Sequence, residues 1–113
     1  MSKKLAGKIA LVTGGSRNVG KDSAMALAHK GADVVITYVN SAEAAAQTVK
    51  ELQSLGVRAA SIRVNLTGTA ELDRLVTEFK LIAKGWGRDS FDILINNAGT
   101  MRLATLEIGR AHV

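Results

Sequence analysis

A glycine-rich turn between a short apolar run and a helix constrains the fold of this chain more than any other feature. Residues 9–12 read Ile-Ala-Leu-Val, as in a buried strand, and residues 13–20 follow with glycines at positions 14, 15 and 20. The alanine-rich residues 23–28 are typical of a helix that faces a sheet. Glycines let a backbone approach a pyrophosphate, and the N–H groups and dipole of a helix N-terminus attract its charge. The sequence therefore predicts a phosphate-binding turn.

A second phosphate-binding motif fits the same residues. The segment from Gly15 to Lys21 matches most of a P-loop, with four residues between two glycines and a lysine after the second. A P-loop then needs Ser or Thr to hold magnesium, but the next residue is Asp22, whose carboxylate would face the phosphates. A dinucleotide-binding turn has no requirement at that position, so we prefer it and keep a degenerate P-loop as the alternative.

The composition fits one small domain and excludes several kinds of site. A chain of 113 residues with 47% hydrophobic residues is long enough for one small domain with a core, but not for two domains. Because the chain has no cysteine, we expect no disulfide and no thiolate metal site, and we predict no metal ion. Nothing resembles a signal peptide or a membrane-spanning run, so we expect a cytoplasmic protein with no membrane partner.

The net charge of +5 raises nucleic acid as a partner. The lysines and arginines are scattered, however, and aromatic residues that stack on bases make up only 4% of the chain. Solvated surface charge explains this pattern better, and we predict no nucleic-acid partner. A basic α/β protein that binds RNA remains a third interpretation.

Strand and helix patterns alternate along the chain. Further strands are predicted at residues 33–38, 58–64 and 91–95, and further helices at residues 42–55 and from residues 67–69 to 85. Ser41 is the expected N-cap of the first of these helices. This alternation predicts right-handed βαβ units on a parallel sheet whose strands are covered on both faces.

The fourth strand runs into Asn96-Asn97-Ala98-Gly99, at a strand end where open α/β sheets bind ligands. Together with Thr13-Gly14 and Asn18-Val19-Gly20 upstream, this segment resembles the short-chain dehydrogenase/reductase family, which pairs Thr-Gly-x-x-x-Gly-x-Gly with Asn-Asn-Ala-Gly. The resemblance covers about residues 5–106. Within the family, the sequence is similar to 3-oxoacyl-carrier-protein-reductase-like members.

The resemblance implies a Rossmann-type, doubly wound parallel sheet of the α/β class, truncated after its fourth strand and ordered 3-2-1-4. We expect a partial NAD(P)-binding domain over residues 1–107. Residues 108–113 form a non-native-looking tail, because they lack the apolar periodicity of the long helix expected there.

Family positions also imply a set of cofactor-binding residues. The turn would hold the pyrophosphate, and the Asn-Asn-Ala-Gly segment would line the adenosine ribose. The full set is Gly14, Ser16, Arg17, Asn18, Val19, Gly20, Tyr38, Asn40, Ser41, Asn65, Leu66, Asn97, Ala98 and Gly99.

Two positions of this set depart from the family pattern. Asn18 replaces the middle glycine of the turn, and asparagine is the non-glycine residue best tolerated at positive φ. Asn65 replaces the aspartate that hydrogen-bonds adenine, a contact that its amide oxygen can make more weakly.

The cofactor is predicted from the end of the second strand. NAD-binding proteins place an acidic residue about twenty residues after the turn to hold the ribose 2′-hydroxyl. Residues 38–41 read Tyr-Val-Asn-Ser and contain no carboxylate, whereas Arg17 offers a guanidinium that suits a 2′-phosphate. NADP(H) is therefore favoured over NAD(H).

No catalytic residue is predicted within this chain. The family uses a tyrosine, a lysine four residues later and a serine, but the only tyrosine is Tyr38 and Ala42 stands four residues later. The resemblance implies an NAD(P)-dependent oxidoreductase that transfers hydride between a nicotinamide cofactor and a carbonyl or alcohol substrate. We expect the full-length protein to form a homo-oligomer. The fragment alone should be inactive, because it lacks these catalytic residues. It should also fold poorly, because the fourth strand would pair with the first but lack a fifth strand on its other edge.

Overall fold

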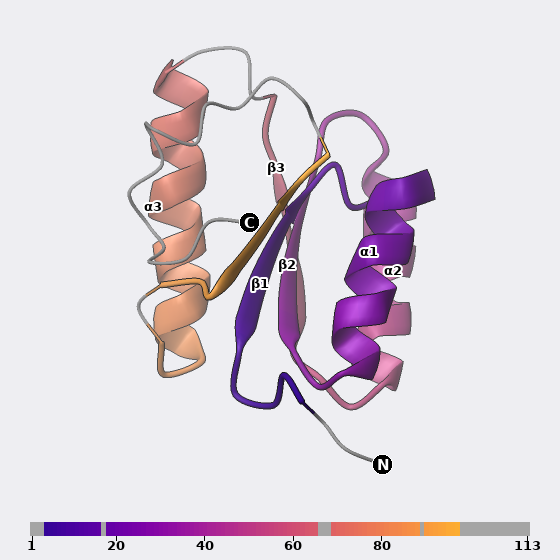
Figure 1. Ribbon diagram of the computed structural model, residues 1–113. Coiled ribbons are helices and arrows are strands. Elements are labelled where there is room, and N and C mark those ends of the chain that lie inside the picture. The colour runs from indigo at the N-terminus through magenta and orange to yellow at the C-terminus, as the bar shows by residue number, and fades with distance from the viewer. Residues whose placement is uncertain (1–3, 17, 66–68, 89, 98–113) are drawn as a thin grey trace.

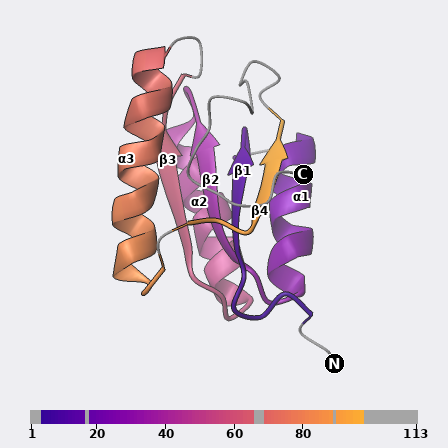
Figure 2. The same ribbon diagram turned by 60° about the vertical axis from the view of Figure 1, so that its left-hand side comes forward.

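A parallel β-sheet covered by helices on both faces organises the structure, a computed structural model that describes residues 4–16, 18–65, 69–88 and 90–97. The described elements, in chain order, are β1 (Ile9–Thr13), α1 (Asn18–His29), β2 (Asp33–Tyr38), α2 (Ala42–Ser54), β3 (Ala59–Arg63), α3 (Thr69–Gly85) and β4 (Ile93–Asn96). The four described strands lie in the order β3-β2-β1-β4, and every neighbouring pair is parallel (Figure 2). The predicted Rossmann-type fold and its strand order are confirmed.

The two faces of the sheet bury alternate residues of the same strands. Ile9 and Leu11 pack with Phe79 of α3, whereas Ala10 and Val12 pack with small residues of α1 and α2. All four of these β1 side chains are fully buried. Figure 1 shows α3 on one face and α1 with α2 on the other. This two-sided cover explains why the strands are nearly continuous apolar runs.

Two strands begin later than predicted, and a carboxylate accepts a backbone hydrogen bond beside each start. The Oδ2 atom of Asp92 accepts a hydrogen bond from the Ile9 backbone N–H at 2.9 Å, and β4 begins only at Ile93. In the same way, Oδ1 of Asp33 accepts from the Arg58 N–H at 2.8 Å, and β3 begins at the following residue. Beside each of these strand starts, a carboxylate is therefore hydrogen-bonded to a backbone N–H of another segment.

The carboxyl ends of all four described strands lie along one edge of the sheet, at the top of Figure 2. The glycine-rich turn follows β1, Val39 follows β2, Asn65 follows β3 and Asn97 follows β4. The fold therefore brings four segments, far apart in the sequence, to the edge where open α/β sheets bind ligands.

The packing of α3 predicts a matched pair of stability effects. Phe79 is fully buried and meets Phe91 edge-to-face, with ring centroids 5.8 Å apart, whereas Leu81 on the same helix is 67% exposed. Phe79→Ala should lower the free energy of unfolding by about 3–5 kcal/mol. Leu81→Ala should change it by no more than about 0.5 kcal/mol. Denaturant titration of both variants measures this, and equal losses would contradict the packing of α3 described above.

Candidate nucleotide-binding site

The glycine-rich turn is fixed in place by β2. The backbone N–H of Gly14 donates to the hydroxyl of Thr37 at 3.0 Å, and the N–H of Gly15 donates to the carbonyl oxygen of Thr37, also at 3.0 Å. The Thr48 hydroxyl of α2 donates to the Ser16 carbonyl oxygen at 2.8 Å. These bonds hold the turn so that α1 begins at the carboxyl edge of the sheet. The first N–H groups of a helix have no intrahelical partners and bind anions well.

Two glycines are required by the close packing of this turn. A Cβ atom added to Gly20 would overlap the carbonyl oxygen of Gly14. A Cβ atom added to Gly15 would lie 2.6 Å from Cγ2 of Ile36. The absence of a side chain at Gly20 therefore lets α1 lie against the end of β1, and its absence at Gly15 lets the turn lie against β2.

Asn18 adopts the left-handed conformation that its position demands. Its φ angle is +58°, and it is the one described non-glycine residue with a positive φ. The tolerance predicted for asparagine here is confirmed. The residue is exposed, as is the neighbouring Val19 at 69%. The helix start therefore presents an accessible surface.

The end of β4 is tied to the end of β1. The buried Thr13 hydroxyl lies 2.9 Å from Oδ1 of Asn96 and accepts a hydrogen bond from the Asn97 N–H at 3.0 Å. The Asn96 side chain thus satisfies the neighbouring strand end, whereas Asn97 is exposed at the same edge.

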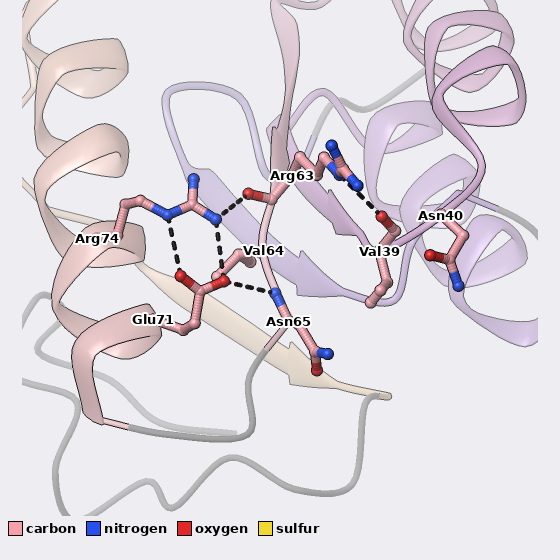
Figure 3. Close-up of a pocket in the computed structure, with 7 residues that line it drawn as sticks. All are labelled: Val39, Asn40, Arg63, Val64, Asn65, Glu71 and Arg74. Carbon is pink, nitrogen blue, oxygen red and sulfur yellow. Dashed lines mark hydrogen bonds and ion pairs between the residues drawn. The ribbon is translucent and has the colours of Figure 1, made fainter.

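A pocket of about 490 Å³ opens beside the ends of β2 and β3 (Figure 3). Seven residues line it: Val39, Asn40, Arg63, Val64, Asn65, Glu71 and Arg74. Its volume lies within the range of about 300–1,000 Å³ that is usual for small-molecule sites. The pocket is therefore large enough for a nucleoside.

One wall of the pocket is a clamp between β3 and α3. Glu71 accepts hydrogen bonds from the Asn65 backbone N–H at 3.1 Å and from Arg74 at 3.0 and 3.2 Å. Arg74 also donates to the carbonyl oxygen of Arg63 at 2.7 Å and to Glu78 at 2.7 Å. The clamp fixes the backbone where β3 ends.

The hydrogen bonds of the clamp also set its charge state. Those from Arg74 and then from the Asn65 N–H lower the pKa of the Glu71 carboxyl below its ordinary value. The bond to Glu71 in turn raises the pKa of Arg74. Because a lowered pKa favours the ionised carboxylate, the clamp is formed at neutral pH and weakens only as the pH falls through that pKa.

The predicted site residues fall into three groups. Gly14, Ser16, Asn18, Val19 and Gly20 form the turn, and Asn97 lies at the same edge. Asn40 and Asn65 line the pocket. Arg17, Leu66, Ala98 and Gly99 lie outside the described residues.

Tyr38 and Ser41, which were also predicted to bind the cofactor, both have a place in the fold. The Tyr38 side chain packs against the core beneath α1 and α2, and its carbonyl oxygen accepts from the Val64 N–H at 2.9 Å. Ser41 is the N-cap residue of α2, as predicted, but its side chain makes no capping hydrogen bond.

Sequence reasoning missed five of the seven lining residues: Val39, Arg63, Val64, Glu71 and Arg74. Glu71 and Arg74 stand three residues apart in the first turns of α3, a spacing that favours side-chain pairing on a helix. This spacing was the available signal. Their contact with the end of β3 depends on tertiary packing and leaves no sequence pattern.

The residues of the alternative P-loop are engaged differently. The Lys21 ammonium forms an ion pair with Glu51 of α2 at 2.8 Å, whereas a P-loop lysine contacts phosphates. Across the described ranges, no group of three or more acidic, histidine or cysteine residues is arranged to hold a metal ion. No helix in the described part is long and apolar enough to cross a membrane.

The close contact at Gly20 predicts a position-specific effect of a single methyl group. Gly20→Ala should destabilise the protein by about 1–3 kcal/mol, because backbone must move on both sides of the contact. At Gly85, the last residue of α3, an added Cβ atom would meet only open space, so Gly85→Ala should be neutral or stabilising by about 0.4–1 kcal/mol. Thermal and denaturant unfolding compare the two, and a tolerated Gly20→Ala would contradict the contact.

The positive φ of Asn18 predicts the order of two substitutions. Asn18→Gly should change the free energy of unfolding by less than about 1 kcal/mol, because relief of strain offsets the added freedom of the unfolded chain. Asn18→Val should cost about 1–3 kcal/mol, since a β-branched residue is strained at this φ. Equal stability of the two variants would show that residue 18 leaves the left-handed region.

Comparison with known proteins assigns the fold to a family. The family model for short chain dehydrogenases matches residues 8–111. A trihydroxynaphthalene reductase of Colletotrichum orbiculare is 40% identical over 100 residues, which span 88% of this chain and 34% of that protein. The chain therefore covers about a third of the length of this curated relative.

Solved structures give the same assignment. A short chain dehydrogenase from Burkholderia cenocepacia, in complex with NADP, is 42% identical with a TM-score of 0.75, over 93% of this chain and 42% of that one. The angucycline C-6 ketoreductase LanV with bound NADP is 37% identical with a TM-score of 0.82, over 89% of this chain and 40% of that one. By motif, fold and sequence, the chain belongs to the short-chain dehydrogenase/reductase family.

Proposed function

We propose that this chain is the cofactor-binding part of an NADP(H)-dependent oxidoreductase that transfers hydride between the cofactor and a carbonyl or alcohol substrate. The observation that carries the proposal is one shared edge of the sheet. An anion-binding helix start and a nucleoside-sized pocket both lie there, at the ends of β1 and of β2 and β3. The NADP-bound relatives of the same fold support it.

The residues at this edge fit the parts of a dinucleotide. The N–H groups at the start of α1 bind the pyrophosphate, and Gly20 lets that helix start lie against the Gly14 carbonyl oxygen. Asn65 receives the adenine through its side-chain amide, and Asn40 lies near the adenosine ribose. Asn97, just after β4, forms the second wall. The cofactor supplies the hydride, and the chain holds and orients the cofactor.

The preference for NADP(H) rests on charge at the end of β2. Val39 and Asn40 are exposed there and Ser41 begins α2, so this segment offers neutral groups where an NAD-specific site has a carboxylate. A carboxylate would repel a 2′-phosphate, whereas Arg17 in the turn adds a guanidinium that attracts one.

The proton-transfer residues belong to a part of the enzyme outside these 113 residues. The Tyr38 side chain packs into the core beneath α1 and α2, and the sequence has no lysine four residues after it. The carbonyl or alcohol substrate would bind against those further residues.

Titration of the full-length protein tests the function. NADPH fluorescence should increase and shift to the blue on binding, and NADPH should bind at least tenfold more tightly than NADH. Binding of ATP with magnesium that NADPH does not displace would contradict the proposal and support the degenerate P-loop instead.

Cofactor choice is tested by Arg17→Ala in the full-length protein. Loss of the guanidinium should weaken NADPH binding by about 1.5–3 kcal/mol and leave NADH binding nearly unchanged. Lys30→Ala, which removes one exposed positive charge just after the far end of α1, is the control and should affect neither cofactor. Equal losses for both cofactors would place Arg17 at the pyrophosphate or in the fold. Val39→Asp should shift preference toward NADH.

A further inference from the structure

Arg63 reaches across the pocket from one strand to the next. It is the last residue of β3, and its Nε atom donates a hydrogen bond to the carbonyl oxygen of Val39 at 3.1 Å (Figure 3). Val39 is the first residue after β2. A single bond through Nε orients the guanidinium and leaves its two terminal nitrogens to bind another group.

The charges around the pocket are unequally compensated. Arg74 is paired with two carboxylates, those of Glu71 and Glu78, at 3.0 and 2.7 Å. Within the described part of the chain, Arg63 has no acidic partner and its terminal nitrogens have no hydrogen-bond acceptor. The pocket wall therefore carries one guanidinium whose charge is not neutralised, and a bound anion would neutralise it.

The position of the Arg63 guanidinium indicates which group of a dinucleotide it would bind. The residues just after β2 are those that hold the ribose hydroxyl of a dinucleotide in this kind of fold. Arg63 is anchored on the carbonyl oxygen of the first of them, and Asn40 lines the pocket beside it. A phosphate monoester on that hydroxyl would meet a planar guanidinium, which forms two parallel hydrogen bonds with phosphate.

We propose that Arg63 is a specificity-determining residue that binds the 2′-phosphate of NADP(H), with the Asn40 amide as a neutral donor beside it. This inference rests on the proposed dinucleotide function, and it assigns recognition of the 2′-phosphate to Arg63. The clamp contributes to it, because Arg74 holds the Arg63 carbonyl oxygen at 2.7 Å and so fixes the backbone that carries the guanidinium. A preorganised cation loses less conformational entropy on binding.

The test compares three variants of the full-length protein in parallel titrations with NADPH and NADH. Arg63→Ala should weaken NADPH binding tenfold or more and change NADH binding less than twofold. Arg63→Lys should restore part of the loss, because lysine keeps the charge without the planar fork. Arg58→Ala is the matched control: Arg58 lies at the opposite end of β3 and donates to the Trp86 carbonyl oxygen, so both cofactors should bind as before.

Smaller ligands test the contribution of the 2′-phosphate to binding separately from the rest of the cofactor. Adenosine 2′,5′-bisphosphate should compete with NADPH better than AMP in the unmodified protein, and Arg63→Ala should remove that difference. The salt dependence of NADPH binding should also fall in this variant, since a charge contact is lost.

Each other result overturns a different claim. Equal losses of NADPH and NADH binding, or no loss of either, would overturn the role of Arg63 while dinucleotide binding by the protein still stands. Equal affinity of the unmodified protein for NADPH and NADH would overturn the 2′-phosphate contact as well. Failure of the unmodified protein to bind either cofactor would overturn the proposed function itself.

Discussion

The structure depends on the close approach of α1 to the end of β1. Gly20 lies so near the Gly14 carbonyl oxygen that no Cβ atom fits between them, and Thr37 fixes the same turn through its hydroxyl and its carbonyl oxygen. This contact places the start of a helix at the carboxyl edge of a parallel sheet. The edge attracts anions because backbone N–H groups there have no partners in the helix. The pocket at β2 and β3 is relevant to a dinucleotide because it shares this edge.

Polar side chains at the strand ends define the rest of the site. Asp92 and Asp33 accept backbone hydrogen bonds at the starts of neighbouring strands, and Glu71 does the same where β3 ends. Thr13 and Asn96 join the ends of β1 and β4. The apolar residues of the sheet build two cores, one beneath each helical layer, while these few polar groups form hydrogen bonds at the starts and ends of strands. The binding edge is therefore held by specific hydrogen bonds on a scaffold formed by burial.

The sequence was sufficient for the order of elements, the parallel sheet and the turn. Continuous apolar strands and alternating helices permit few topologies, and the requirement for glycine at position 20 is visible as a motif. The sequence also indicated that asparagine at position 18 would tolerate a positive φ, which it adopts. The pocket wall did not follow, because Arg63 and Glu71 are neighbours only through the packing of α3 against β3. The sequence equally did not reveal the direction of the Tyr38 side chain, which is half-buried and packs against the core.

The most direct test of the account is a crystal structure of the full-length protein with NADP⁺. The pyrophosphate should lie against the backbone N–H groups of Val19 and Gly20 at the start of α1. The adenosine should fill the pocket beside Asn65, with its 2′-phosphate against Arg63. A pyrophosphate bound away from the glycine-rich turn, or an adenosine outside this pocket, would contradict the claim that this edge of the sheet is the dinucleotide site.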